Sequence, residues 1–182
     1  MRLRSMLLAA VLAVTGYALA ADAPLFSGKT QAVADAQNGY KLVLPVEFKQ
    51  EATGLAAWWS GPLVAGGGAS VHVNVIPWKG TPLQTIYEAN LKSYKENKGY
   101  TEVTPIKVKG AIGALTFKET GTVQGTQSPK GGGEIHRWHL MAFGNERQYN
   151  VLFGGTYQGF KEGTLPPIYK AIIASFELTP AK

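Results

Sequence analysis

The chain has 182 residues, a formal net charge of +6 at pH 7 and no cysteine. The lack of thiols excludes disulfides, thiolate metal sites and a lipid anchor attached through cysteine. What remains after an N-terminal leader has the length of one ordinary domain, which can fold without disulfides.

The first 20 residues have the three-part layout of a cleavable secretory signal peptide. Two arginines at the start precede an uncharged apolar run, and Ala18 and Ala20 then form a small-x-small pattern. The apolar run of about ten residues is shorter than the roughly 20 that a membrane-spanning helix needs. We therefore expect an exported protein, periplasmic or secreted, with no membrane-spanning segment. Its expected organisation is a signal peptide over residues 1–20, a flexible leader over 21–28 and a single domain over 29–182.

Strands dominate the first part of that domain. The alternation of apolar and polar residues and the turn signals between them predict strands over residues 30–34, 40–45, 55–60 and 70–76. The last is the clearest, because Val71, Val73 and Val75 share one face of a half-buried strand. The pair Asn38-Gly39 predicts a tight turn between the first two strands.

Irregular structure is expected around the third of these strands. Residues 47–54 show no clear period, and Gly61 and Pro62 are expected to end the strand that follows them. Gly66, Gly67 and Gly68 are expected to form a flexible loop.

One helix is predicted over residues 83–94. Thr81 is the expected N-cap, Pro82 the first helical residue and Gly99 the left-handed stop. The apolar stripe is made by Leu83, Ile86, Tyr87, Leu91 and Tyr94.

More strands and a second helix complete the chain. Four strands are predicted over residues 102–109, 111–122, 134–143 and 148–153. Pro105 indicates an edge or a bulge, residues 144–147 a hairpin turn, and residues 124–133 a mobile surface loop. The final helix is expected to begin near Thr164, with Ile168, Ile172 and Phe176 on its apolar face. Runs of strands with few helices predict an α+β fold, an antiparallel sheet packed by two helices.

Four segments carry a resemblance to a known superfamily. They are the strand Asn38-Gly39-Tyr40-Lys41-Leu42-Val43-Leu44-Pro45, the strand 71–76 leading into the helix 83–94, the meander 110–153, and the closing helix ending in Ser175-Phe176-Glu177. Together they resemble the PsbP/Mog1/DcrB-like superfamily of small α/β/α sandwich proteins. The resemblance implies a binding protein, an assembly factor or a periplasmic accessory protein, with no shared active site, so it assigns no catalytic residue.

Histidines provide the one candidate for metal chemistry. His136 and His139 could bind zinc, but residues three apart on a strand point to opposite faces. His72 could join them only if its strand lay alongside. No Gly-x-Ser-x-Gly motif is present. The sequence thus predicts no catalytic residue, no metal site and no cofactor, and His136 and His139 stay weak candidates.

The aromatic residues give the best candidate for a binding site. Trp58 and Trp59 are adjacent, so on a strand they face opposite ways, one into the core and the other toward solvent beside Gly66, Gly67 and Gly68. The alternative is that a sheet-and-helix edge covers both rings.

Three functions remain open on the sequence alone. The first is a non-enzymatic periplasmic binding or accessory protein that recognises a protein of the periplasm or envelope, including a toxin-neutralising protein or an assembly factor. The second is a metal-dependent hydrolase of envelope material that uses His136 or His139. The third is a binder of a polyanionic envelope component through lysines scattered along the chain. Nucleic acid is not expected as a partner, because no reading motif is present.

Overall fold

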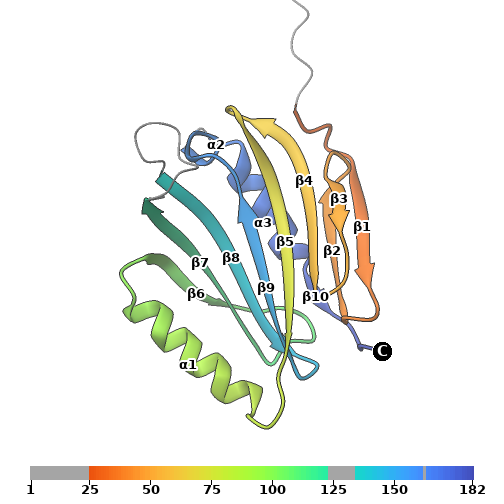
Figure 1. Cartoon of the computed structure of the whole chain (residues 1–182), viewed down its shortest axis with the longest axis vertical. Coiled ribbons are helices and arrows are strands. Elements are labelled where there is room, and N and C mark those ends of the chain that lie inside the picture. The colour runs from red at the N-terminus through yellow and green to blue at the C-terminus, as the bar shows by residue number, and fades with distance from the viewer. Residues whose placement is uncertain (1–24, 123–133, 162) are drawn as a thin grey trace, which may run out of the picture.

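Ten strands and three helices form the part of the chain that the computed structural model describes, residues 25–122, 134–161 and 163–182 (Figure 1). The strands are β1 (Thr30–Asp35), β2 (Tyr40–Pro45), β3 (Lys49–Ala52), β4 (Ala56–Val64), β5 (Gly67–Pro77), β6 (Tyr100–Ile106), β7 (Gly113–Thr122), β8 (Glu134–Gly144), β9 (Arg147–Gly154) and β10 (Glu177–Leu178). The helices are α1 (Leu83–Glu96), α2 (Tyr157–Lys161) and α3 (Leu165–Ser175). The α+β class with antiparallel sheets is confirmed. The predicted signal peptide, the first half of the leader (residues 21–24) and the predicted loop 124–133 lie outside the described residues.

The larger sheet has seven antiparallel strands in the order β3-β4-β5-β9-β8-β7-β6. β5 pairs with β9 from Ser70 to Pro77, so the chain leaves the middle of the sheet through α1 and re-enters at the far edge as β6. A smaller sheet has the order β1-β2-β10. None of the helices in the described part of the chain is long and apolar enough to cross a membrane.

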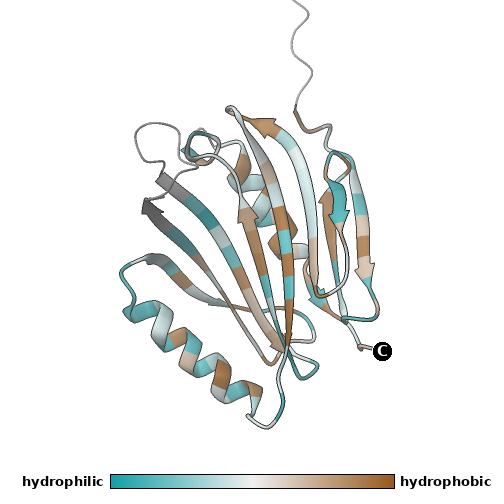
Figure 2. Cartoon of the chain, in the orientation of Figure 1, coloured by the Kyte–Doolittle hydropathy of each residue, from teal (hydrophilic) through white to brown (hydrophobic). Residues whose placement is uncertain are grey.

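Strict alternation makes β5 the best-defined strand of the sheet. Val71 and Val73 are fully buried on one face, whereas His72 and Asn74 face the other way. Figure 2 shows this alternation as hydrophobic and hydrophilic bands along the strand. We call the face that carries the valines the inner face and the opposite one the outer face.

The inner face is covered by α3 and by the smaller sheet. Tyr169 and Ile172 of α3 are buried, and the ring of Phe176 stacks 6.0 Å from Tyr40 of β2. Ser175 binds the two units together, because its Oγ accepts the backbone N–H of Val43 at 2.9 Å. Each such buried side chain contributes about 1.5–3 kcal/mol to folding.

The outer face is covered only in part. Four buried residues of β7 and β8 meet the apolar stripe of α1: Leu115, Phe117, Met141 and Phe143. The predicted stripe of the helix is thereby confirmed. α1 packs mainly over β6, β7 and β8, and Figure 1 shows it at the β6 side of the sheet, away from β4.

Two predictions near β4 were wrong. The stretch expected to be irregular contains β3, an exposed edge strand whose short polar sequence gives no alternation signal. Gly61 and Pro62 do not end β4, which continues to Val64 after a shift of register. Proline has no backbone N–H to donate to a neighbouring strand. Because β3 pairs with β4 only as far as Ser60, no residue of β3 requires a hydrogen bond from position 62.

The predicted caps of the first helix were also wrong. Pro82 is the N-cap and makes no side-chain cap hydrogen bond, so Thr81 does not form the capping box. The helix ends at Asn97, whose Oδ1 accepts the N–H of Gly99 at 2.9 Å. An asparagine side chain thus satisfies the end of the segment in place of a left-handed glycine. Two further elements, α2 and β10, had no clear periodic signal because they are too short.

Gly110 is held where no side chain fits. Its φ is +79°, and an added Cβ would lie 2.5 Å from the carbonyl oxygen of Leu178 in β10. The backbone there is tied by a 2.9 Å hydrogen bond from the N–H of Leu178 to the oxygen of Lys109.

The variant Gly110→Ala is therefore expected to lose on the order of 2–4 kcal/mol of stability, measured by urea unfolding. Gly54→Ala is the matched control, because its φ is +87° but nothing lies within 4 Å of the added Cβ. Its free energy of unfolding should fall only by the cost of placing alanine in a left-handed conformation, about 1–2 kcal/mol. Equal losses in the two variants would contradict the role of the Leu178 contact.

Candidate functional site

The two adjacent tryptophans lie on opposite faces of β4. Trp59 is in the core and 2% exposed, whereas Trp58 is 40% exposed on the outer face. The ring of Trp58 stacks on His72 of the neighbouring strand, with 5.3 Å between centroids and 10° between planes. This stack holds the exposed indole in a fixed orientation on a rigid strand.

The residues around Trp58 form a surface that α1 reaches only at its edge, where Tyr94 shares a hollow with Asn74, Asn150 and Leu152. We call it the open face: the outward positions of β4, β5 and β9, which include Trp58, Leu63, His72, Asn74, Ile76, Asn150 and Leu152. Leu63 is 70% exposed and Ile76 is 41% exposed. The outward positions of β5 and β9 carry no lysine, arginine, aspartate or glutamate.

The three glycines beside Trp58 do not form the flexible loop that was predicted. Ala65 and Gly66, with φ of 49° and 83°, make the two-residue turn of the β4–β5 hairpin, and Gly67 and Gly68 already belong to β5. A side chain at Gly67 would collide with Thr156, 2.1 Å away. Gly66 serves the tight turn, and Gly67 allows close packing against Thr156. Of the two glycines that belong to β5, Gly68 is the exposed one, and it lies on the outer face.

The histidines of β8 face opposite sides of the sheet, as the alternation predicts. His136 lies on the inner side, 6.4 Å from the ring of Phe160, and His139 stacks 4.5 Å from Phe117 on the outer side. Among the described residues, no group of three or more histidine, aspartate or glutamate side chains is arranged to hold a metal ion.

His139 is partly buried and paired with a carboxylate. Its Nε2 lies 3.1 Å from Oε2 of Glu119, which places the proton of the neutral ring on Nε2. Burial lowers the pKa of His139, although the contact with Glu119 opposes that shift. Burial also lowers the pKa of His72, and the positive charge of Arg137 adds to the effect.

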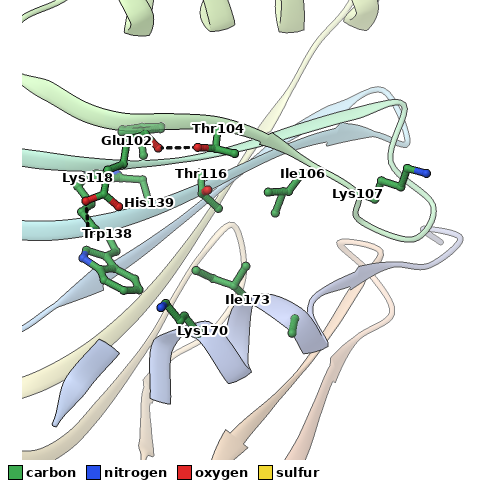
Figure 3. A pocket seen from close by; sticks show the side chains of 12 residues that line it. Glu102, Thr104, Ile106, Lys107, Thr116, Lys118, Trp138, His139, Lys170 and Ile173 are labelled. Atoms are coloured by element: carbon green, nitrogen blue, oxygen red, sulfur yellow. Dashed lines mark hydrogen bonds and ion pairs between the residues drawn. The ribbon is translucent and has the colours of Figure 1, made fainter. Parts of the chain in front are cut away.

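A second concave site lies on the inner face, where sequence reasoning expected none. It is a cleft with a volume of about 430 Å³ between α3 and the strands β6, β7 and β8 (Figure 3). Trp138, Ile106 and Ile173 form its apolar part, and Lys118 and Lys170 stand beside the indole. The Nζ of Lys118 is 4.8 Å from the ring centroid of Trp138.

One sequence signal could have pointed to this cleft. Along β7 the inner positions Ala114, Thr116 and Lys118 are small or polar, while Leu115 and Phe117 on the outer side are large and apolar. A sheet face with small side chains opposite an apolar helix leaves space. The signal needs knowledge of which helix lies opposite, and the sequence alone does not supply that.

Solved structures similar to this chain share its fold. A Bacteroides thetaiotaomicron protein aligns with a TM-score of 0.55 at 10% identity, over 81% of this chain and 48% of its own. This chain therefore spans about half the length of that protein. LpqN of Mycobacterium tuberculosis, described as involved in cell envelope biogenesis, aligns with a TM-score of 0.50 at 10% identity, over 84% of this chain and 91% of its own.

A third neighbour is cyanobacterial PsbP of Synechocystis sp. PCC 6803, with a TM-score of 0.48 and 11% identity, covering 88% of this chain and 98% of its own. The resemblance stated from the sequence is supported at the level of the fold by these alignments, whose identities of 10–11% carry nothing beyond the fold. No protein-family model matches the chain, and no curated protein is significantly similar to it.

The two lowered histidine pKa values predict a pH dependence of stability. The unfolded chain takes up protons near the ordinary histidine pKa of about 6.5, whereas His72 and His139 take them up at lower pH in the folded state. Stability should therefore fall as the pH drops from 7.5 to 5.

Urea unfolding at half-unit intervals of pH measures this loss. The double variant His72→Gln with His139→Gln should show a flatter profile over the same range. An unchanged slope in the double variant would contradict the assignment, and the range stays above the pH at which the carboxylates titrate.

Proposed function

We propose that the protein is an exported, non-enzymatic binding or accessory protein that recognises a protein partner with its open face. The observation that carries the proposal is the combination of exposed apolar residues and missing charge on that face. Trp58, Leu63 and Ile76 are all large and exposed, and no charged side chain occupies the outward positions of β5 and β9.

The composition of the open face is that of the centre of a protein–protein interface. Such centres are depleted of charge and enriched in aromatic residues, and exposed apolar patches on rigid elements mark contact sites. Tryptophan is among the residues that contribute most to binding energy. Asn74 and Asn150, register partners on β5 and β9, offer carboxamide groups for hydrogen bonds beside the apolar residues.

The rigidity of the sheet favours binding without rearrangement. Trp58 lies on a strand paired with β5, and its ring is already stacked on His72. A side chain ordered before binding loses less conformational entropy when a partner covers it.

Export rests on the signal peptide predicted over residues 1–20. An envelope setting is compatible with the likeness to LpqN, which is described as involved in cell envelope biogenesis. Recognition of a periplasmic or envelope protein, including neutralisation of a toxin or assistance in assembly, fits that setting.

The other two functions have less support in the described residues. A metal-dependent hydrolase that uses His136 or His139 would need further ligands, but the two histidines face opposite sides of the sheet, and among the described residues neither belongs to a group of three that could hold a metal ion. A binder of polyanions would need cations on the exposed binding face, but the outward positions of β5 and β9 carry none, and Lys41 and Lys109 both pair with Glu177.

Site-specific photo-crosslinking in the native host tests the proposal. A photoreactive amino acid at Leu63, which is 70% exposed on the open face, should capture one defined protein. The same amino acid at Ile112, which is 54% exposed but outside that face, is the matched control. Capture of the same proteins at both positions, or of none at Leu63, would overturn the proposal.

The variant Trp58→Ala gives the energetic test. We expect affinity for the crosslinked partner to fall at least tenfold, the usual cost of truncating a central tryptophan. Because the side chain of Trp58 is 40% exposed, the melting temperature of the variant should differ little from that of the wild-type protein. Unchanged affinity would remove the open face from the interface.

A further inference from the structure

The cleft on the inner face is separate from the open face, since the seven-stranded sheet lies between them. Its volume of about 430 Å³ falls within the range of small-molecule sites. All its lining residues except Lys107 come from three strands and one helix, so its shape is set by the packing of the domain.

The cleft is open because small residues face each other across it. Thr104 and Thr116 are register partners on β6 and β7, and Ala174 of α3 lines the opposite side. Further along the same helix, the gap to the sheet is filled by rings, with Tyr169 centred 5.0 Å from Phe153. The space beside the threonines has no such filling.

The apolar part of the cleft is a fixed platform. Trp138 projects from β8 into the space between sheet and helix, and the ring of Phe160 in α2 lies 6.0 Å from it. Ile106 and Ile173 extend this surface along the cleft (Figure 3). A flat ring or an alkyl chain lying on these residues would lose contact with water over much of its surface.

The polar part of the cleft has an excess of positive charge. Lys118 and Lys170 flank the indole of Trp138, and Lys107 lies at the other end (Figure 3). Glu102 pairs with Lys118, whereas no carboxylate of the described residues lies within ion-pair distance of Lys170 or Lys107. The cleft therefore has a net excess of two positive charges among the described residues, one at the end formed by Lys118, Lys170 and Glu102 and one at Lys107.

The position of Glu102 shows that the rim is specifically shaped. β6 has one extra residue between Thr101 and Thr104, and Glu102 in this bulge has a φ of 53°, unusual for a residue with a side chain. The bulge brings its carboxylate to Lys118, and its carbonyl oxygen accepts a hydrogen bond from Thr104 Oγ1 at 3.1 Å. Bulges of this kind are common next to binding sites.

We propose that this cleft binds a single-chain anionic amphiphile, with its apolar chain against Trp138, Ile106 and Ile173 and its carboxylate or phosphate between Lys118 and Lys170. A free fatty acid and a phosphorylated lipid share this chemistry. An alkyl chain would cover the apolar residues, and an anionic head group would replace the water that the lysine ammonium groups otherwise hold.

Titration with three twelve-carbon probes tests the proposal. Dodecanoate, dodecyl phosphate and dodecyltrimethylammonium are each added below their micellar concentrations to the purified protein, with binding followed by calorimetry and by amide chemical shifts. We expect the anions to bind at least tenfold more tightly than the cation and to shift amides of β7, β8 and α3. Preference for dodecanoate or for dodecyl phosphate identifies which head group the site takes.

Two pairs of variants locate the binding site. Ala174→Phe fills the cleft and should abolish anion binding, whereas Ala171→Phe, on the same helix but lining a different hollow beside Pro167 and Ile168, should not. Lys170→Gln should weaken binding roughly tenfold, and Lys95→Gln on α1 should change it less than twofold.

Three results would overturn the proposal: no binding of either anion, equal binding of anion and cation, or equal loss in Ala174→Phe and Ala171→Phe. The variants that fail to bind must keep the wild-type melting temperature, so that loss of binding is not loss of fold. Crosslinking of a protein partner through Leu63 is a separate experiment. A negative result for the cleft therefore does not affect the proposal that the open face binds a protein.

Discussion

The packing of α3 against the inner face of the large sheet is the interaction on which the rest of the structure depends. The hydroxyl of Tyr169 donates to the carbonyl of Gly154 in β9, and Ser175 binds the backbone of Val43 in β2. One helix therefore connects the two sheets, and Ile172 is buried between them. Because α3 is held near its middle and at its C-terminal end, its distance from β6 and β7 is fixed too. The width of the cleft follows from that distance and from the small residues on either side.

A second constraint is that each strand serves two faces at once. Trp59 fills the core while its neighbour Trp58 is exposed, and Trp138 lies on the inner side of the sheet while the ring of His139 stacks on Phe117 on the outer side. A one-residue slip in register would exchange these roles along the whole strand. The hairpins that set register are tight, with Asn145 and Glu146 at φ of 51° and 54° between β8 and β9. Turn geometry and site geometry are thus coupled in this fold.

Local patterns were sufficient to predict the parts of the fold that have a clear period. The valines of β5, the stripes of α1 and α3 and the opposite orientations of Trp58 and Trp59 all follow from spacing along the chain. The edge strand β3 was missed because it buries little, and the glycines at 66–68 were misread because a tight hairpin and a loose loop share the same composition. The cleft was not predictable from any one segment, since Thr104, Thr116 and Ala174 come together only in the folded domain.

The pairing of the last residues has a consequence for the time at which the domain can close. β10 pairs with β2, and the N–H groups of Thr179 and Lys182 donate to Gly39 and Ala36, so residues far apart in the chain meet there. A ribosome or a translocation channel delivers the chain from its N-terminus, so β2 emerges long before α3 and β10. Until those residues emerge, the inner face lacks the part of its cover that α3 provides. The inner face can therefore close only after α3 and β10 have been synthesised, later than the other nine strands.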